Sequence, residues 1–276
     1  MQIIHNKPSN SLAGLSTNER KIISTINLSN KTIVQSSDIV ERFDISSQKA
    51  NIILSRLCKK GWLQRIKRGS YILIPLESNS TQPLPEENWS MASELFSPCY
   101  LSGWTAAEYW NLTEQIFNTI VAFTASPQRK SEHTIAGIRY RTNQINSKNI
   151  FGTKKLWINN KQVLIADIHK TLVDVLMYPS IGGGGEHVVK IAKNYWKNKE
   201  ADPNKLLEYS LRINKGVLFK RLGYTAEIFG SVPNDWLDDL RSRISQGISK
   251  FDPTSPDKGK ILTRWHLRYN APTINV

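Results

Sequence analysis

Apolar residues in the first quarter of the chain recur at spacings that predict helices followed by a hairpin. Ile22, Ile23 and Ile26 have helical spacing and follow Ser16–Glu19, whose hydroxyl and carboxylate stand three positions apart, as in a capping box. Short β-branched runs then alternate with serine-rich segments that favour helix starts. The elements expected in order are a helix to about Leu28, a strand over 32–35, a helix capped by Ser36 or Ser37, a turn over 43–45, and a helix from Ser46–Ser47 to about Lys60.

A glycine and a basic turn delimit the hairpin that follows. Gly61 is placed to end the preceding helix as a C-cap glycine, and strands are expected over 62–66 and 71–74 on either side of the turn 67–70. The order helix, strand, helix, helix, hairpin is that of a winged helix-turn-helix. The pattern therefore predicts such a domain over residues 1–76.

A change of pattern separates this domain from a larger one. Residues 77–90 are polar, contain two prolines and lack periodicity, which is typical of a linker. Residues 91–276 mix helical and strand-like segments, so the fold class predicted for the chain is α+β. The expected elements are helices over 89–95 and 102–112; strands over 116–124, 134–141, 154–158 and 162–165; helices over 167–176, 186–198, from Pro203, 217–229 and 233–244; and, from Lys260, a last strand of the same sheet.

Composition adds a strong positive charge. The 276 residues include 37 Lys and Arg against 23 Asp and Glu, a formal net charge of +14. Residues 1–75 hold 12 Lys or Arg and four Asp or Glu, a net charge of +8. The remaining 201 residues hold 25 Lys or Arg and 19 Asp or Glu, a net charge of +6. An excess concentrated in this way favours a polyanionic partner. The chain has no apolar run of the roughly 18 residues that a membrane span needs, and its first residues do not resemble a secretory signal, so we expect a cytoplasmic protein.

The helix expected over 46–60 divides into an apolar and a polar face. Ala50, Ile53, Leu54 and Leu57 fall together on a helical wheel and are expected to face the core. Helix-turn-helix proteins place the opposite face in the major groove, where Asn and Gln pair with adenine and Arg or Lys with guanine or phosphate, while wing cations follow the backbone or enter the minor groove. The expected DNA contacts are Ser46, Ser47, Gln48, Lys49, Asn51, Ile52, Ser55, Arg56, Lys59, Arg65, Lys67, Arg68, Gly69 and Ser70.

A winged helix can also serve as a protein-docking module, and a charged helix face is often only solvated. The net charge of +8 and the lack of any acidic residue in the helix over 46–60 or in the wing favour duplex DNA as the partner.

The run Gly182–Gly185 invites a phosphate-binding interpretation, because backbone amides at a helix start can cradle an anion. It lacks the GK[ST] sequence of a phosphate-binding loop and follows a helix rather than a strand. A turn between helices is the better interpretation.

The other candidates for chemistry are weaker. Asp167, His169 and Asp174 form a small acid–histidine group, but Asp167 stands where a helix N-cap is expected. Cys58 and Cys99 lie 41 positions apart without a partner motif, as expected of two reduced thiols rather than zinc ligands. We therefore expect no metal, no cofactor and no enzymatic activity.

Basic residues recur in the second domain. Most are expected on solvated faces, and a subset to extend the DNA footprint or face a partner. They are Arg139, Arg141, Lys148, Lys154, Lys155, Lys190, Lys193, Lys197, Lys199, Lys215, Lys220 and Arg221.

Several short motifs, in order and spacing, resemble the AbiEi family, the antitoxins of type IV (AbiE, abortive-infection) toxin–antitoxin systems. They are Arg68–Tyr71, Leu101–Glu108 with Leu112–Gln115, Ile165–Asp167 with Lys170–Asp174, the glycines at 182–185, Lys220–Tyr224 with Glu227, and Trp265–Asn270. The resemblance covers nearly the whole chain. It implies a transcriptional autorepressor that binds inverted repeats in its own promoter, with an antitoxin activity in the second domain. The implied partner is a neighbouring nucleotidyltransferase-like toxin, countered without a stable complex.

Two other functions remain open at this point. One is a nucleic-acid-acting enzyme that the winged helix targets, which would turn over nucleic acid or nucleotides in a metal-dependent way. The other is a stand-alone repressor whose second domain senses a ligand, and a toxin gene next door would argue against it.

Overall fold

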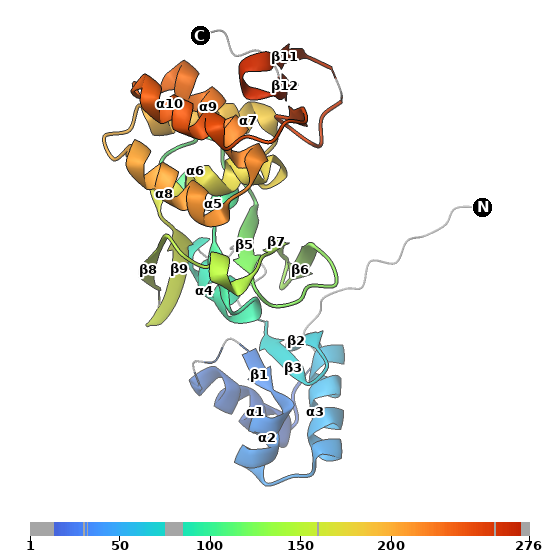
Figure 1. The fold of residues 1–276 in the computed structure, drawn as a ribbon. Helices are drawn as coiled ribbons and strands as arrows, with labels where there is room; N and C mark the ends of the chain where they lie inside the picture. Colours follow the sequence, from blue (N-terminus) through green and yellow to red (C-terminus); the bar gives the residue numbers. More distant parts are fainter. Residues whose placement is uncertain are drawn as a thin grey trace, which may run out of the picture. The chain divides into compact units, whose positions relative to one another are not determined.

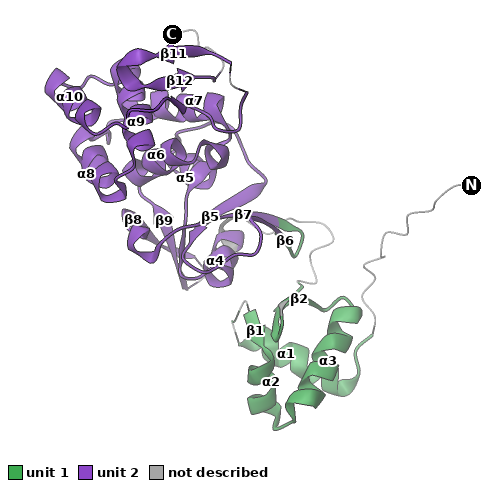
Figure 2. Ribbon diagram, turned by 45° about the vertical axis from the view of Figure 1, so that its right-hand side comes forward, with its two compact units in different colours: residues 1–85, 134–138 green, residues 86–133, 139–276 purple. Residues whose placement is uncertain are grey.

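The computed structural model describes residues 14–29, 31, 33–74, 85–158, 160–256 and 258–271 (Figure 1). The chain divides into two compact units (Figure 2). The first comprises residues 1–85 and 134–138, and the second residues 86–133 and 139–276. Helices and strands are both abundant, so the chain is an α+β protein, as the pattern predicts.

In its described part, the first unit holds three helices and a three-stranded antiparallel sheet of order β1-β3-β2. The elements are α1 (Thr17–Leu28), β1 (Ile33–Gln35), α2 (Ser36–Phe43), α3 (Ser47–Lys59), β2 (Leu63–Lys67) and β3 (Ser70–Leu73). The predicted order of helix, strand, helix, helix and hairpin is confirmed.

Local hydrogen bonds explain where these helices begin and end. The Ser16 Oγ accepts from the Glu19 N–H and the Glu19 carboxylate accepts from the Ser16 N–H at 2.8 Å, so the predicted capping box is present. The Ser46 Oγ accepts from the Lys49 N–H at 3.2 Å and caps α3, while Gly61 adopts φ +81° just past its end.

The predicted cap of α2 was wrong. The helix begins at Ser36, and Gln35 rather than Ser36 or Ser37 is its N-cap. The Asp38 carboxylate accepts from the Gln35 N–H at 2.9 Å, which sets the helix start one residue earlier.

The core of the first unit is built from one apolar face of each helix and from the sheet. Among its fully buried side chains are Ile22, Ile26, Val34, Ile39, Leu54, Leu57, Leu63 and Tyr71. This packing fixes α3 with one face inward, which decides which of its side chains reach the surface.

The second unit is a mixed sheet with helices on both faces, and its strand order in the described residues is β6-β7-β5-β4-β9-β8. The pairs β5–β7 and β4–β9 are parallel, whereas β4–β5 and β8–β9 are antiparallel. Apart from Pro85 and residues 134–138, which belong to the first unit, its first elements are α4 (Pro85–Leu95), β4 (Cys99–Leu101), α5 (Gly103–Tyr109), β5 (Thr119–Thr124), β6 (Glu132–Ile135), β7 (Ile138–Gln144), β8 (Thr153–Ile158) and β9 (Lys161–Ala166).

A helical layer follows the sheet in sequence. It comprises α6 (Ile168–Met177), α7 (Gly185–Trp196), α8 (Pro203–Ile213), α9 (Gly216–Phe229) and α10 (Asn234–Ser242). These helices share one apolar core, and α6 runs through its centre with Leu172, Val173, Val175 and Leu176 fully buried. Side chains of β4 bond to α4 on one face of the sheet, through Cys99, and to α6 on the other, through Tyr100.

Several predicted boundaries in this unit differ from the structure. Residues 85–90, predicted as part of the linker, form the start of α4, and residues 75–84 lie outside the described residues. The helix predicted to reach 112 ends at Tyr109, since Asn111 adopts a left-handed φ of +53°. The strand predicted over 134–141 is a hairpin, with Ala136 and Gly137 both at positive φ in its turn.

The C-terminal strand was also placed wrongly. Residues from Lys260 do not join the large sheet but form a separate small one, of order β10-β12-β11. Its strands are β10 (Ser249–Lys250), β11 (Lys260–Leu262) and β12 (Leu267–Tyr269). Within the described ranges, no helix has the length and apolarity required to span a membrane.

Candidate nucleic-acid interface

Helix α3 presents a sharply divided surface. Ala50, Leu54 and Leu57 are fully buried and Ile53 is half-buried, as the helical wheel predicts. On the opposite side every predicted contact residue is exposed, including Ile52 at 59% exposure. The exposed residues of this α3 surface are Ser47, Gln48, Lys49, Asn51, Ile52, Ser55, Arg56 and Lys59.

The hairpin of β2 and β3 contributes a second group of predicted residues, which the structure divides. Arg65 and Arg68 are exposed, and Gly69 turns the chain at φ +76°. The side chain of Lys67 lies outside the described part of the chain. Ser70 is buried and donates to the Gln35 Oε1 at 2.9 Å, so its side chain belongs to the interior and not to the predicted contact surface.

The charges on α3 and the β2–β3 hairpin favour the binding of an anion. Residues 45–76 contain no Asp or Glu and seven Lys or Arg. One of the seven, Lys60, donates to the buried Glu19 carboxylate at 2.7 Å, and this hydrogen bond, with that from Ser16, lowers the pKa of Glu19 to about 2. No carboxylate within the described residues pairs with Lys49, Arg56, Lys59 or Arg68. Their charges are therefore available to a ligand.

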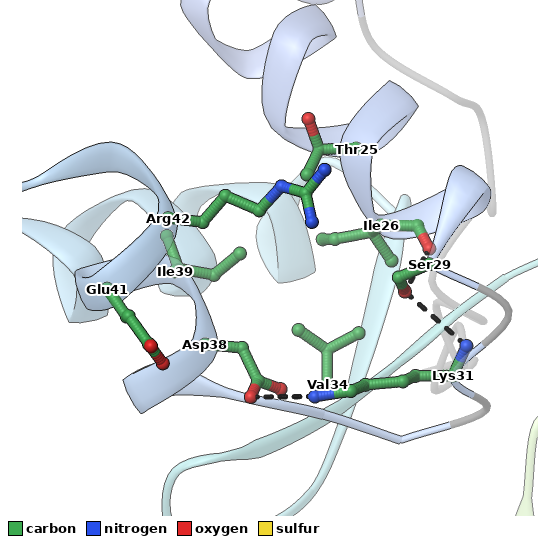
Figure 3. Close-up of a pocket in the computed structure, with 9 residues that line it drawn as sticks. All are labelled: Thr25, Ile26, Ser29, Lys31, Val34, Asp38, Ile39, Glu41 and Arg42. Atoms are coloured by element: carbon green, nitrogen blue, oxygen red, sulfur yellow. Dashed lines mark hydrogen bonds and ion pairs between the residues drawn. The ribbon is translucent and has the colours of Figure 1, made fainter.

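The first unit also contains a cavity of about 390 Å³ between α1, β1 and α2 (Figure 3). Ile26, Val34 and Ile39 form its apolar floor, and the Lys31–Asp38 ion pair of 3.0 Å stands at its edge. The lining residues are Thr25, Ile26, Ser29, Lys31, Val34, Asp38, Ile39, Glu41 and Arg42. None of these residues belongs to α3, so the cavity is separate from the α3 surface.

The acid–histidine group of the second unit does not converge on one point. The Asp167 carboxylate caps α6 by accepting from the Lys170 N–H at 2.7 Å and also accepts from the Tyr209 hydroxyl. His169 Nδ1 contacts the Tyr195 hydroxyl at 2.7 Å, and burial lowers the pKa of this imidazole. The capping interpretation of Asp167 is confirmed.

Asp174 belongs instead to a buried cluster that sequence reasoning missed. Its carboxylate accepts from the Lys170 ammonium, from the Ser102 hydroxyl at 2.7 Å and from the Tyr100 hydroxyl at 3.0 Å. Lys170 is 1% exposed and lies 5.0 Å from the ring centres of Tyr100 and Phe151. The available signal was the i,i+4 spacing of Lys170 and Asp174 within a largely apolar helix. The polar groups of the cluster are hydrogen-bonded to one another, and through Tyr100 they link α6 to β4 of the sheet.

The glycine run is a turn between helices, as predicted. Gly183 and Gly184 adopt φ near +90°, and α7 begins at Gly185. The Gly185 N–H donates to the Asp252 carboxylate at 2.7 Å. A protein carboxylate thus occupies the position where a phosphate-binding loop would offer its amide.

Two of the basic residues of the second domain, expected on solvated faces or at a DNA or partner surface, are buried instead. Arg221 donates to the carbonyls of Leu176, Met177 and Lys250, and Lys220 donates to the carbonyl of Gly247. Both tie α9 to its neighbours. The exposed members of the predicted set are Arg139, Lys148, Lys154, Lys155, Lys190, Lys197, Lys199 and Lys215, while Arg141 and Lys193 are half-buried.

No group of three or more metal-ligating side chains occurs in the part of the chain that the structure describes. Both cysteines are free. Burial raises the pKa of the Cys99 thiol to about 12, so it stays protonated.

Comparison with known proteins identifies the fold but no family. The chain matches no protein-family model, and no curated protein sequence is significantly similar to it. It is similar in structure to the RV2827C protein from Mycobacterium tuberculosis, with a TM-score of 0.60 and 14% sequence identity over 94% of each chain. A likeness at this level of identity concerns the fold alone.

Proposed function

We propose that the first unit is a winged helix-turn-helix that binds double-stranded DNA, with α3 as the recognition helix and β2–β3 as the wing. The order of its elements and the packing of α3 against α1 and α2 support this assignment. The chain acts as a transcriptional autorepressor and has no enzymatic activity.

The α3 surface is the observation that carries the proposal. Its exposed polar groups match the donor and acceptor pattern of base edges, and its unpaired cations match phosphates. Gln48 and Asn51 stand on the first two turns, where recognition helices contact bases, while Arg56 and Lys59 lie further along. The acidic residues of the described first unit lie on α1, on α2 or at the end of α2.

A mobility-shift titration with duplex DNA from the region upstream of the gene tests this assignment. In one variant Lys49, Arg56 and Lys59 are replaced by Gln, and in a control with the same loss of charge Lys197, Lys199 and Lys215 are replaced by Gln. We expect the first variant to lose about tenfold or more in affinity and the control to change far less. Equal losses in both variants would contradict a specific interface on α3.

Base contacts are tested separately from phosphate contacts. Substituting Gln48 or Asn51 by Ala is expected to cost roughly 1–3 kcal/mol on the preferred sequence and to relax the preference. Replacing Lys67 and Arg68 together is expected to weaken binding to all sequences about equally. An Asn51→Ala variant with the wild-type sequence preference would exclude a base contact for that side chain.

We further propose that the second unit is the antitoxin domain of a type IV toxin–antitoxin system and that the protein works in the cytoplasm. This part rests on the resemblance to the AbiEi family. The functional partner is a nucleotidyltransferase-like toxin encoded next to this gene, countered without a stable complex.

Co-expression with the neighbouring gene tests the antitoxin role. The full chain should restore growth, and so should the DNA-binding variant with Lys49, Arg56 and Lys59 replaced, because neutralisation resides in the other unit. Toxicity that persists at equal expression would contradict the antitoxin role and leave the DNA-binding proposal untouched.

A further inference from the structure

Trp157 is an exposed tryptophan on the edge of the large sheet. Its side chain is 72% exposed, near the end of β8. Single exposed aliphatic residues are common on protein surfaces, whereas Trp side chains are largely buried on average. An indole exposed to this extent offers apolar ring surface for stacking.

The strand register places polar partners on the same face as this indole. Successive side chains of a strand alternate between faces, so Lys155 and Trp157 share one face at a separation of about 7 Å along the strand. On β9, Gln162 lies directly opposite Trp157, and Leu164 lies opposite Lys155. Lys155 and Gln162 are both exposed. The result is a flat aromatic surface flanked by an amide and a cation.

The two strands of this edge, β8 and β9, carry basic side chains and no acidic ones. Residues 133–166 contain six Lys or Arg and no Asp or Glu. Two carboxylates bonded to this strand pair or next to it in sequence are occupied, because Glu94 pairs with Lys161 and Asp167 accepts from the Lys170 N–H and the Tyr209 hydroxyl. Edge strands often carry lysines that prevent edge-to-edge pairing, which accounts for Lys155 alone but leaves the exposed indole unexplained.

We propose that Trp157 and Lys155 form a platform for unpaired nucleic acid, in which a base stacks on the indole and Lys155 binds the adjoining phosphate. Base stacking on aromatic side chains beside basic residues is the general means of binding single strands. A base within a duplex is stacked between its neighbours and cannot offer its face, so the platform selects unpaired segments. This surface is independent of α3 and goes beyond the proposed duplex binding.

Fluorescence anisotropy of the full chain with labelled strands of about 12 nucleotides tests the platform. The strands are oligodeoxythymidine, oligouridine and an abasic strand of equal charge. We expect both base-bearing strands to bind, and the abasic strand to bind about 5- to 150-fold more weakly. Comparing oligodeoxythymidine with oligouridine measures any preference for DNA or RNA. Trp157→Ala should lose the same factor, and Trp157→Phe should retain most of the affinity.

Two control variants separate the contributions. Lys155→Gln should weaken base-bearing and abasic strands alike, because it removes a phosphate contact. Ile116→Ala, at a side chain that is 78% exposed in the same unit, should change nothing. Trp157→Ala should also keep the wild-type affinity for the upstream duplex, so failure of the platform and failure of the proposed function are distinguishable.

Three results would overturn the proposal. One is equal affinity for abasic and base-bearing strands, and another is a Trp157→Ala variant that binds oligodeoxythymidine like the wild type. The third is a wild-type protein that binds neither oligodeoxythymidine nor oligouridine. If that protein self-associates through Trp157, a second copy covers this face.

Discussion

Lys170 carries its charge inside the second unit, at 1% exposure. Burying an ammonium group is costly unless partners compensate, and here Asp174 and the Tyr100 hydroxyl accept its hydrogen bonds while aromatic rings surround it. Burial and the Asp174 charge also raise the pKa of Tyr100 well above its usual value, so its hydroxyl remains a donor. The buried charges of Lys170 and Asp174 on α6 and the hydroxyl of Tyr100 on β4 therefore depend on one another.

We predict that Lys170→Ala destabilises the protein by about 3–5 kcal/mol, because it leaves the Asp174 carboxylate buried without its counter-charge. Urea unfolding followed by near-ultraviolet circular dichroism of the second unit measures the effect. Lys199→Ala, at an exposed position, should stay within about 0.5 kcal/mol of the wild type. Equal stability of the two variants would show that the cluster contributes nothing.

The Glu19–Lys60 pair gives the first unit a dependence on acid pH. The folded-state pKa of Glu19 is about 2 against 4.5 for the free side chain, chiefly through the hydrogen bond from Lys60. Stability from this group is fully present above pH 4.5 and is lost as the pH falls from there through 2.

We expect the urea midpoint of the first unit, followed by amide signals of α1, to fall over that range of pH. In Glu19→Gln the fall should be smaller, because the neutral side chain does not titrate. A wild-type and a variant curve of the same shape would contradict the assigned pKa.

At the scale of elements, local signals in the sequence were sufficient to predict a helix and its ends where a capping residue, an amphipathic run and a C-terminal glycine coincide. Helix α3 has all three, in Ser46, its apolar face and Gly61, and was predicted to within a residue. Strands β8 and β9 were also predicted to within a residue at each end, and in the structure Asn160 turns the chain between them at φ +62°.

Predictions from local sequence patterns were wrong where contacts between distant segments decide the structure. The strand from Lys260 is held by β12, and β12 in turn by β10, contacts that no local pattern encodes. Lys220 and Arg221 belong to a set of basic residues expected mostly on solvated faces, with a subset at DNA or a partner, yet backbone carbonyls of distant segments accept their hydrogen bonds.

The contact between Gly223 on α9 and Trp265 in the C-terminal segment leads to a testable prediction. A Cβ on Gly223 would come within 2.0 Å of the Trp265 ring, which is itself buried. Ala normally stabilises a helix interior relative to Gly by about 1 kcal/mol. Here we expect Gly223→Ala to destabilise the protein by about 1–3 kcal/mol, because the indole has to move.

Thermal unfolding of the full chain measures this effect. Gly247→Ala serves as the control, since nothing lies within 4 Å of its Cβ position and its stability should be nearly unchanged. A Gly223→Ala protein as stable as the wild type would mean that Trp265 is not packed against α9.

At the scale of the whole molecule, charge and fold carry different information. The fold is similar to that of a mycobacterial protein at 14% identity, and a shared fold does not assign a function. The net charge of +14, by contrast, concerns partners directly. Of the predicted contact residues, those on α3 are exposed as expected, because helical periodicity separates inner from outer positions. Ser70 is not, because its burial depends on Gln35 from another strand.

The salt dependence of duplex binding tests the central claim most directly. The full chain is titrated with its upstream duplex between about 50 and 200 mM salt. If about six phosphates are neutralised, log K should fall against log salt with a slope of about −5, and replacing Lys49, Arg56 and Lys59 by Gln should make the slope shallower by about 3. A wild-type affinity insensitive to salt, or a variant with the wild-type slope and affinity, would contradict a DNA interface on α3.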